Sequence, residues 1–313
     1  MCGDALIDLF PSGKDESAEC FVPVCGGSCR NVAVGVARLG MAVAFVGAVG
    51  NDRFGDMLST DLSGNGVKTD YLQRVDESTT CGFVFQVVDG SNYQFYSNST
   101  ADSMWVLDDR ADELLEDARW LHVGSVTLAR GLAAESLERV MYRARDRGQV
   151  ISFDPNVRLE VSDDVSRYVD RIMRLASIAS VVKVSEEDLV AIGVSESQFV
   201  AECLAGDCTF VAVTRGKGGS VGYVKGGGFV TTKAAEVEVV DAVGAGDGYM
   251  AGMITGLVNK GVIDDGGLRG CGTATFEEVM RFSSVVAGLT CSRVGANPPT
   301  ISEVREVVTL PTG

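Results

Sequence analysis

The chain reads Asp241-Ala242-Val243-Gly244-Ala245-Gly246-Asp247 at the point from which most of its architecture can be inferred. The alternating valines and acids of residues 237–240 predict a strand before this stretch, and the small apolar residues 248–257 predict a helix after it. Two glycines therefore stand where a strand turns into a helix, so backbone N–H groups can approach a ligand closely. Because a helix N-terminus also favours negative charge, the turn can hold phosphate oxygens.

Asp247, at the end of this turn, can be interpreted in two ways. An Asp at the start of a helix is common as a capping residue. An acid beside an anion site repels the anion, however, so a chemical use for it is the alternative. Asp247 would be a base that accepts a proton from a hydroxyl group, while neighbouring N–H groups stabilise charge on a transferring phosphoryl group. The second acid, Asp241, favours this functional interpretation.

Composition excludes several other classes of function. The chain has 27 Lys and Arg against 43 Asp and Glu, a formal charge of −16, which argues against a nucleic-acid or anionic-membrane surface. Nine cysteines accompany one histidine, His122, which argues against a disulfide framework and a Cys/His zinc site. Asp4 and Asp8 interrupt the first apolar run, and no uncharged stretch is long enough to span a membrane. We therefore expect a cytoplasmic protein.

Alternating apolar strands and amphipathic helices predict an α/β fold with a parallel sheet covered on both faces. Ligands of such sheets bind at the carboxyl ends of the strands, where the sequence has Asp154, Ser185, Thr214 and Asp247. The expected strands are residues 5–10, 42–47, 120–126, 150–154, 180–184 and 210–214, and the expected helices are residues 30–39, 54–65 and 133–147. Residues 21–24 and 82–96 instead predict antiparallel strands, the latter a hairpin turning at Asp89–Asn92.

Residues 241–247 resemble the second signature of the ribokinase-like (PfkB) carbohydrate kinases, D-T-x-G-A-G-D, with Ala242 where Thr is common. The first signature of that family is similar to residues 26–40, Gly-Gly-Ser-Cys-Arg-Asn-Val-Ala-Val-Gly-Val-Ala-Arg-Leu-Gly, and residues 45–56 continue it. The resemblance runs from Gly3 to Thr300, and two signatures in the right order are far more specific than one.

This resemblance implies a ribokinase-like three-layer α/β/α fold, with a mainly parallel central sheet and a small antiparallel β-lid. A single domain would span residues 1–313, and the lid would comprise residues 10–25 and 80–98. In the family the lid closes over the sugar and often pairs with a second subunit, so a homodimer is expected. An ordinary surface hairpin is the alternative for residues 82–96.

The resemblance also implies roles for individual residues. Those expected in catalysis are Asp247, Gly244, Ala245, Gly246 and Arg158. Those expected to bind the sugar are Asp8, Gly26, Gly27, Asn31 and Asp247. Those expected to bind ATP are Lys183, Ser185, Thr214, Gly216, Gly219, Gly246 and Asn297. Mg²⁺ would be held through water by Asp188, which stands where the family has Glu, or by Glu187, and a monovalent cation such as K⁺ would lie at Asp241 and the Val243 carbonyl.

Each assignment has a purely structural alternative. Asn31 suits a helix cap, and Ser185 followed by Asp188 suits a capping box. Arg158 could pair with Asp163 or Asp164 at the surface. Residues 214–219 could be a simple hairpin turn, and they lack the Walker A spacing.

The motifs most resemble those of bacterial fructokinases, in Asp154–Arg158, Lys183–Glu187, Leu121–Ser125 and Thr100–Asp102. Ser28-Cys29-Arg30 fits neither the fructokinase nor the ribokinase pattern, so Arg30 could alter specificity. Ser97 follows Tyr96 where 2-keto-3-deoxygluconate kinases often carry Arg, which favours a neutral hexose. The expected reaction is ATP-dependent phosphorylation of D-fructose to fructose 6-phosphate. Alternatives are a 2-keto-3-deoxygluconate, ribose or nucleoside kinase, or a non-catalytic relative.

Overall fold

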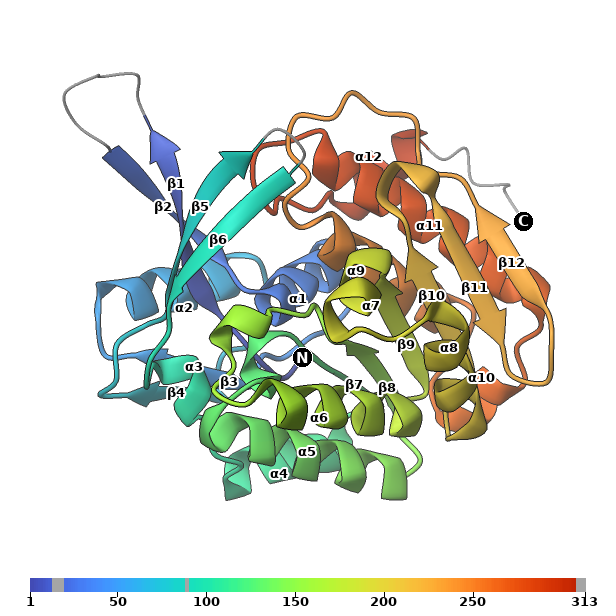
Figure 1. Ribbon diagram of the computed structural model, residues 1–313, viewed down its shortest axis with the longest axis horizontal. Coiled ribbons are helices and arrows are strands. Elements are labelled where there is room, and N and C mark those ends of the chain that lie inside the picture. The colour runs from blue at the N-terminus through green and yellow to red at the C-terminus, as the bar shows by residue number, and fades with distance from the viewer. Residues whose placement is uncertain (13–19, 88–89, 308–313) are drawn as a thin grey trace.

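The computed structural model describes residues 1–12, 20–87 and 90–307, and its core is a six-stranded sheet between two layers of helices (Figure 1). The strand order is β12-β11-β10-β9-β8-β7, in which β7 to β10 are parallel and β11 and β12 antiparallel. The strands are β7 (Trp120–Gly124), β8 (Val150–Asp154), β9 (Val181–Ser185), β10 (Phe210–Thr214), β11 (Ser220–Val224) and β12 (Phe229–Thr232). The α/β prediction is confirmed.

Strand β10 shows why both faces of the sheet are covered. Val211 and Val213 pack into one hydrophobic cluster, and Phe210 and Ala212 pack into another on the opposite face. Successive side chains of a strand point to opposite faces, so an unbroken apolar run needs helices on both sides.

Two sets of helices supply this cover. One set comprises α4 (Asp109–Asp117), α5 (Gly131–Asp146), α6 (Val165–Ile178), α7 (Glu186–Ile192) and α8 (Glu196–Ala205). The other comprises α1 (Ser28–Arg38), α2 (Arg53–Gly64), α9 (Ala245–Asn259), α10 (Asp265–Arg269), α11 (Thr273–Cys291) and α12 (Ile301–Val307). Shorter elements are α3 (Ala101–Met104), η1 (Val126–Leu128), η2 (Leu159–Val161), η3 (Gly216–Gly218) and the parallel pair β3 (Gly47–Gly50) and β4 (Leu72–Val75).

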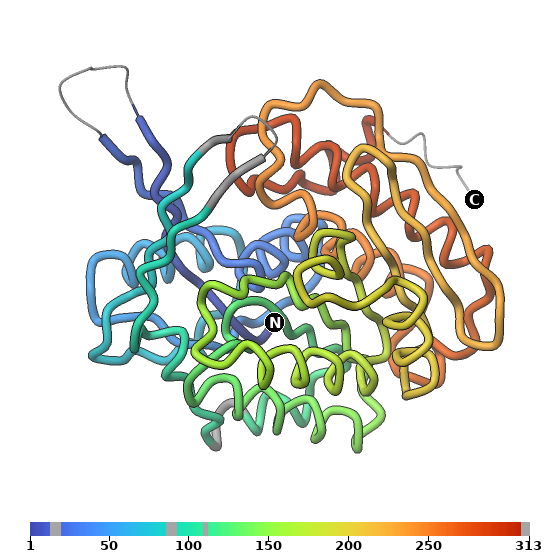
Figure 2. The backbone as a smooth tube through the Cα atoms, in the orientation of Figure 1, coloured from blue at the N-terminus to red at the C-terminus, as the bar shows by residue number. Residues whose placement is uncertain are grey.

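A separate four-stranded sheet, here called the small sheet, projects from the body (Figure 2). Its strand order is β2-β1-β5-β6, with β1 (Leu6–Ser12), β2 (Cys20–Gly26), β5 (Cys81–Val87) and β6 (Gly90–Tyr96). Its strands fall within or beside the expected lid ranges, of which residues 13–19 and 88–89 lie outside the described residues. Val87 pairs with Gly90, so the expectation of a turn at Asp89–Asn92 is wrong: Gly90, Ser91 and Asn92 belong to β6.

Two other sequence expectations are wrong in detail. Residues 237–240 form no strand; they run along the end of α11, where the N–H groups of Val240 and Asp241 donate to the Cys291 carbonyl. These residues are largely exposed, and the helix end already supplies an acceptor, so sheet pairing is not needed. The strand expected at residues 42–47 begins only at Gly47, because Ala44 and Val46 make isolated bridges instead.

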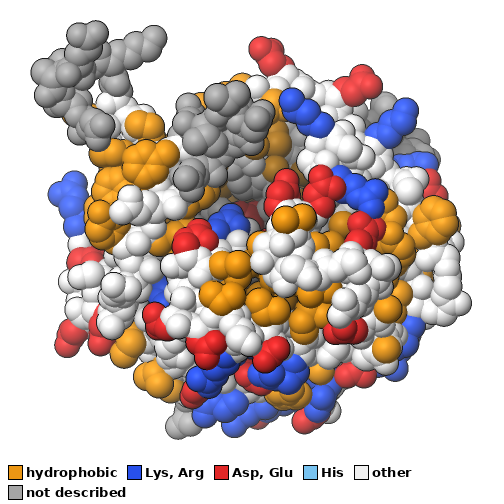
Figure 3. Space-filling view, in the orientation of Figure 1, with side chains coloured by type: hydrophobic (Ala, Val, Ile, Leu, Met, Phe, Trp, Pro, Cys, Tyr) orange, Lys and Arg blue, Asp and Glu red, His pale blue; other side chains and the backbone are white. Residues whose placement is uncertain are grey.

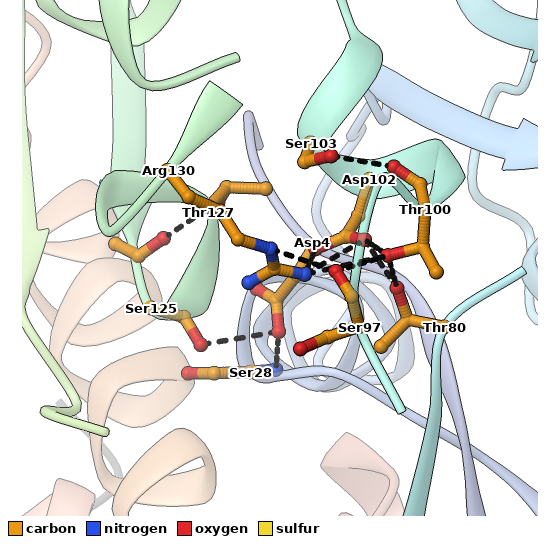
Figure 4. A network of polar contacts seen from close by, with 11 residues as sticks. Asp4, Ser28, Thr80, Ser97, Thr100, Asp102, Ser103, Ser125, Thr127 and Arg130 are labelled. Carbon is orange, nitrogen blue, oxygen red and sulfur yellow. Dashed lines mark hydrogen bonds and ion pairs between the residues drawn. The ribbon is translucent and has the colours of Figure 1, made fainter. Parts of the chain in front are cut away.

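A buried ion pair joins both ends of the β5–β6 hairpin to the body (Figure 4). Arg130, which precedes α5, donates through Nε to the Ser97 carbonyl at 3.0 Å and lies 3.3 Å from the Asp102 carboxylate. The hydroxyl groups of Thr80, before β5, and Thr100, after β6, also donate to Asp102. The small sheet is therefore tied to the body at both stems by one charged cluster.

Among residues 1–12, 20–87 and 90–307, none of the helices has the length and apolarity required to cross a lipid bilayer.

We expect Arg130→Met to lower the free energy of unfolding by about 3 kcal/mol, because it leaves the buried Asp102 without its cation. Urea denaturation would measure this. The control is Arg281→Met, which removes an exposed ion pair with Glu277 and should cost less than about 1 kcal/mol. A loss for Arg130→Met no larger than that of the control would show that the pair does not anchor the small sheet.

Candidate active site

Asp247 lies in the first turn of α9, and two side chains of α1 hold its carboxylate. Ser28 Oγ donates to Oδ1 at 2.6 Å, and Asn31 Nδ2 donates to Oδ2 at 2.8 Å. Gly244 precedes the helix with φ 77°, and a Cβ there would lie 2.6 Å from Ala296 Cβ. The turn therefore requires glycine for its left-handed backbone and for its close packing.

The N-terminus of helix α1 lies beside the same site, since Ser28 and Asn31 of its first turns contact Asp247. Its N-cap residue, Gly27, has φ 99° and no side chain, so the cap comes from Asp4, two residues before β1. The Asp4 carboxylate accepts from the N–H groups of Ser28 at 2.9 Å and Cys29 at 3.1 Å. Asn31 lies inside the helix rather than at its cap, so its amide is free to face Asp247. The capping alternative for Asn31 is therefore wrong.

Asp8 on β1 is a buried carboxyl group on the small sheet. A Cβ at Gly26 would lie 2.1 Å from Asp8 Oδ2, so glycine at position 26 makes the room for this carboxylate. Burial, and after it the charges of Asp4 and Asp247, raise the pKa of Asp8 to about 7, against the opposing charges of Arg30 and Arg158. With a pKa near 7, the short side chain of Asp8 is partly protonated at neutral pH.

Lys183 brings a buried cation to the start of α9. Its Nζ lies 2.7 Å from Asp154 Oδ2 and 2.9 Å from where a Cβ of Gly246 would be. Burial lowers the pKa of Lys183, but the carboxylates of Asp154 and Asp188 outweigh it, so the pKa is raised and the ammonium group stays charged. A charged ammonium beside a helix N-terminus favours an anion at this point.

Ser185 and Asp188 form the capping box of α7. Asp188 Oδ2 accepts from the Ser185 N–H at 2.9 Å and hydroxyl at 2.8 Å, and Oδ1 accepts from the Val157 N–H at 2.7 Å. The capping alternative is therefore confirmed, and both oxygens of Asp188 are already hydrogen-bonded within the chain. Glu187, next to it, is exposed. In the described part of the chain, no three His, Cys, Asp or Glu side chains are grouped as metal ligands.

The Gly-rich turn after β10 is a hairpin turn, as its structural alternative predicts. Thr214 ends β10, η3 follows, and β11 returns antiparallel. Gly219 has φ 84°, and a Cβ there would lie 2.1 Å from the Thr232 carbonyl oxygen, whereas a Cβ at Gly216 would meet open space. The fold therefore requires glycine at position 219, whereas Gly216 has open space beside its backbone.

The segment after α11 closes on the same side of the molecule. Asp241 Oδ1 accepts from the Val243 N–H at 3.0 Å, and Oδ2 accepts from the Gly295 N–H at 2.9 Å, which joins this segment to the turn before α9. The exposed Asn297 accepts a hydrogen bond from Arg38 Nη1 at 2.5 Å. Ala245, whose N–H was expected to face an anion, donates to the Ala242 carbonyl at 3.2 Å.

Arg158 faces the small sheet rather than solvent acids. Its guanidinium carbon lies 5.6 Å from the centre of the Tyr93 ring on β6, and Arg158 Nη1 donates to the Val157 carbonyl. Among the described residues no ion pair joins it to Asp163 or Asp164, so that alternative is wrong. Figure 3 shows a hollow between the small sheet and the body.

Sequence reasoning missed several residues of the site: Asp4, Ser28, Asp61, Tyr93 and Asp154 as the partner of Lys183. Asp4 carried a signal, since an acid beside an apolar strand needs donors. Asp154 carried one as well, because it follows a strand at the end where ligands bind. Ser28, Asp61 and Tyr93 carried none, because their partners are far away in the chain.

We expect Asp8→Asn to stabilise the ligand-free protein more at pH 8 than at pH 5. The pKa of Asp8, about 7, exceeds its ordinary value of 3.8, so the folded state binds the proton more tightly, and wild type loses stability as pH rises from 3.8 to about 7. The gain in Tm over wild type should therefore be at least about 2 °C larger at pH 8 than at pH 5. Differential scanning calorimetry at both pH values measures this, with the exposed Asp163→Asn as control. A difference in Tm that is equal at both pH values would contradict it.

Comparisons with known proteins agree with this geometry. Residues 2–303 match the model of the pfkB family carbohydrate kinases. The chain is 33% identical to a fructokinase of Rhizobium leguminosarum bv. trifolii over 258 residues, covering 82% of this chain and 78% of the relative. It is also 33% identical to a fructokinase of Salmonella typhimurium over 272 residues, covering 85% and 86%.

Solved structures are similar along nearly the whole chain. Fructokinase with bound ATP from Xylella fastidiosa superposes with a TM-score of 0.90 at 28% identity, covering 98% of this chain and 97% of that one. Fructokinase from Vibrio cholerae O395, in a form with fructose, ADP and calcium ion bound, gives 0.79 at 28% identity over 94% and 92%. These neighbours share the ribokinase-like three-layer fold. The chain belongs to the pfkB family of carbohydrate kinases.

Proposed function

We propose that this sugar kinase transfers the γ-phosphoryl group of ATP to the 6-hydroxyl of D-fructose, with Asp247 as the base. The observation that carries the proposal is the Asp247 carboxylate, buried at the N-terminus of α9, held by Ser28 and Asn31. The ammonium group of Lys183 beside Gly246 adds positive charge at the same helix end. A base and an anion site side by side are what phosphoryl transfer to a hydroxyl group requires.

On the sugar side, Asp8 and Asn31 supply polar groups, and Gly26 and Gly27 supply accessible backbone. Asp8 is flanked by β2 and β5 in the small sheet, and Asn31 is fixed on α1. Rigid elements lower the entropic cost of orienting a flexible polyol. Arg158 and Tyr93 cover the same region from the body and from β6, which supports the small sheet as a lid.

On the nucleotide side, the turn after β10 and the segment after α11 offer the surface for ATP. Thr214, Gly216, Gly219 and Asn297 would line it, with Ser185 nearer the phosphates and Lys183 at the transferred group. ATP supplies the phosphoryl group, and Mg²⁺ held through water by Asp188 or Glu187 would neutralise its charge. Asp188 retains lone pairs for such a water despite its hydrogen bonds within the chain. A monovalent cation would bind at Asp241 and the Val243 carbonyl.

In the proposed mechanism, Asp247 accepts the proton of the primary hydroxyl as the hydroxyl oxygen attacks the γ-phosphorus of ATP. The bond from that phosphorus to the β–γ bridging oxygen breaks, and ADP leaves. The Gly246 N–H and the Lys183 ammonium group stabilise the charge that develops on the phosphoryl group. Ala245 N–H contributes less than expected from the sequence, because it already donates to Ala242. Gly244 keeps the turn narrow enough for these groups to converge.

Fructose is favoured over other acceptors by two observations. The curated relatives that match over most of the chain are named fructokinases. Ser97, buried at the end of β6, supplies no cation for an acidic sugar such as 2-keto-3-deoxygluconate. Ribose and nucleosides remain the alternatives that the acceptor assay below distinguishes.

The small sheet would also form the contact in a cytoplasmic homodimer. Val22 and Tyr96 are exposed large apolar residues on it, and Phe21, Phe83 and Tyr96 make edge-to-face ring contacts. Exposed apolar side chains gathered on one sheet favour association with a second copy.

Asp247→Ala should retain less than about 1% of wild-type turnover, because the general base is lost, while fructose affinity changes less than about tenfold. A coupled ADP-release assay and isothermal titration calorimetry measure the two. Asp163→Ala, an exposed acid far along the chain, should retain full turnover. Turnover above about 1% in Asp247→Ala would exclude Asp247 as the base.

The acceptor assay compares fructose, mannose, ribose, adenosine and 2-keto-3-deoxygluconate with MgATP, with and without K⁺. The proposal predicts the highest kcat/KM for fructose and a product phosphorylated at position 6. A higher kcat/KM for another acceptor would contradict fructose and leave Asp247 untouched. No turnover of any acceptor would contradict the kinase proposal itself.

A further inference from the structure

We propose that Arg30 and Asp61 are a positioning pair that sets the orientation of the Asn31 amide and, through it, holds the catalytic base Asp247. This inference rests on the proposed function, in which Asp247 accepts the proton and Asn31 contacts the sugar. It assigns a purpose to Arg30, the residue of the first signature that matches neither sugar-kinase pattern.

Arg30 lies on α1 and makes contacts in two directions. Its Nε donates to Asp61 Oδ2 on α2 at 2.9 Å, and Nη2 also contacts that oxygen. On the other side, Nη1 donates to Asn31 Oδ1 at 2.9 Å. The Arg30 side chain is only 6% exposed, so its planar guanidinium group is held in one place between α2 and Asn31.

The chemistry of these partners leaves the Asn31 amide one orientation. A guanidinium group can only donate and an ionised carboxylate can only accept. With Arg30 on one side and Asp247 on the other, the amide oxygen has to face Arg30 and the amide nitrogen has to face Asp247. Without Arg30, the amide loses one of the two partners that hold it in this orientation, and only Asp247 is left to fix it.

Asp61 is the residue that keeps Arg30 in this position. A buried cation without a partner is costly, so Arg30 without Asp61 would turn toward another acid. Asp8 is close enough for Arg30 to lower its pKa, so the sugar-binding carboxylate itself would compete for Arg30. The side-chain amide of Asn65 in turn donates to the backbone carbonyl of Asp61 at 2.8 Å, which fixes the end of α2.

The alternative is that Arg30–Asp61 merely joins α1 to α2. The chain offers a matched pair for separating the two roles. Arg171 on α6 is also 6% exposed and pairs with Glu138 on α5, which is 22% exposed, compared with 28% for Asp61. Arg171 touches none of the proposed site residues, so Arg171→Met removes an equally buried cation from the body without touching the site, while Glu138 keeps its ion pair with Arg174.

The test is steady-state kinetics of Arg30→Met, Arg30→Lys and Arg171→Met with the best acceptor sugar. Arg30→Met should lower kcat/KM for the sugar at least about tenfold, and leave the KM for ATP within about twofold, because a misplaced catalytic group is costly. Arg30→Lys should recover only part of the lost kcat/KM, because it keeps the positive charge but a single ammonium group cannot bridge Asp61 and Asn31 as the forked guanidinium group does. Arg171→Met should lower Tm as Arg30→Met does, with unchanged kcat/KM.

A double-mutant cycle with Asn31→Ala decides whether Arg30 acts through Asn31. If it does, adding Arg30→Met to Asn31→Ala should change kcat/KM by less than about twofold, because effects transmitted through one residue are not additive. An additive loss, or an Arg30→Met enzyme with wild-type kcat/KM, would overturn the proposal.

A readout that needs no turnover separates failure of this inference from failure of the kinase proposal. The side-chain amide signal of Asn31 in a ¹⁵N NMR spectrum is identified by its loss in Asn31→Ala. It should shift in Arg30→Met and stay in place in Arg171→Met. If wild type phosphorylates no acceptor and the signal still shifts, the kinase proposal fails and the positioning pair stands. An unshifted signal overturns the positioning pair.

Discussion

Crowding of buried carboxylates around the N-termini of α1 and α9 is the constraint on which the site depends. Asp4, Asp8, Asp154 and Asp247 are all buried, and burial, to which the charge of Asp247 adds, raises the pKa of Asp4 and Asp8. Taking one carboxylate from water is expensive, and like charges nearby add to the expense. The surrounding structure has to supply donors and cations for each of them.

Each carboxylate is met by a different device. The N-terminus of α1 provides two N–H groups to Asp4, and Lys183 provides an ammonium group to Asp154. Ser28 and Asn31 provide a hydroxyl and an amide to Asp247. Burial raises the pKa of Asp8 to about 7, although the charges of Arg30 and Arg158 oppose it. In the proposed reaction, Asp8 binds hydroxyl groups of the sugar, and Asp247 accepts the proton of the hydroxyl group that reacts.

The parallel sheet explains how residues far apart in the chain reach this place. β8 and β9 end beside one another, so Asp154 and Lys183 meet, and β10 ends next in order at Thr214. The small sheet adds Asp8 and Tyr93 from the N-terminal third of the chain. The carboxyl ends of the main-sheet strands and the small sheet thus both contribute residues to the proposed site.

By itself, the sequence determined the layer architecture and indicated the residues that we propose carry the chemistry. Apolar runs such as Val150–Asp154 and Phe210–Thr214 predict buried parallel strands by local pattern, and Gly244–Asp247 predicts an anion-binding helix start by local backbone chemistry. Only the tertiary structure decided which side chains pair. Residues 237–240 alternate like a strand, yet the end of α11 supplies their acceptor. Arg30 and Asp61 lie on different helices. The chain offers many other acids with which Arg30 could have paired, and many other bases with which Asp61 could have paired. Backbone periodicity is a local property, whereas ion-pair partners depend on how helices pack, and packing is settled by the whole core at once.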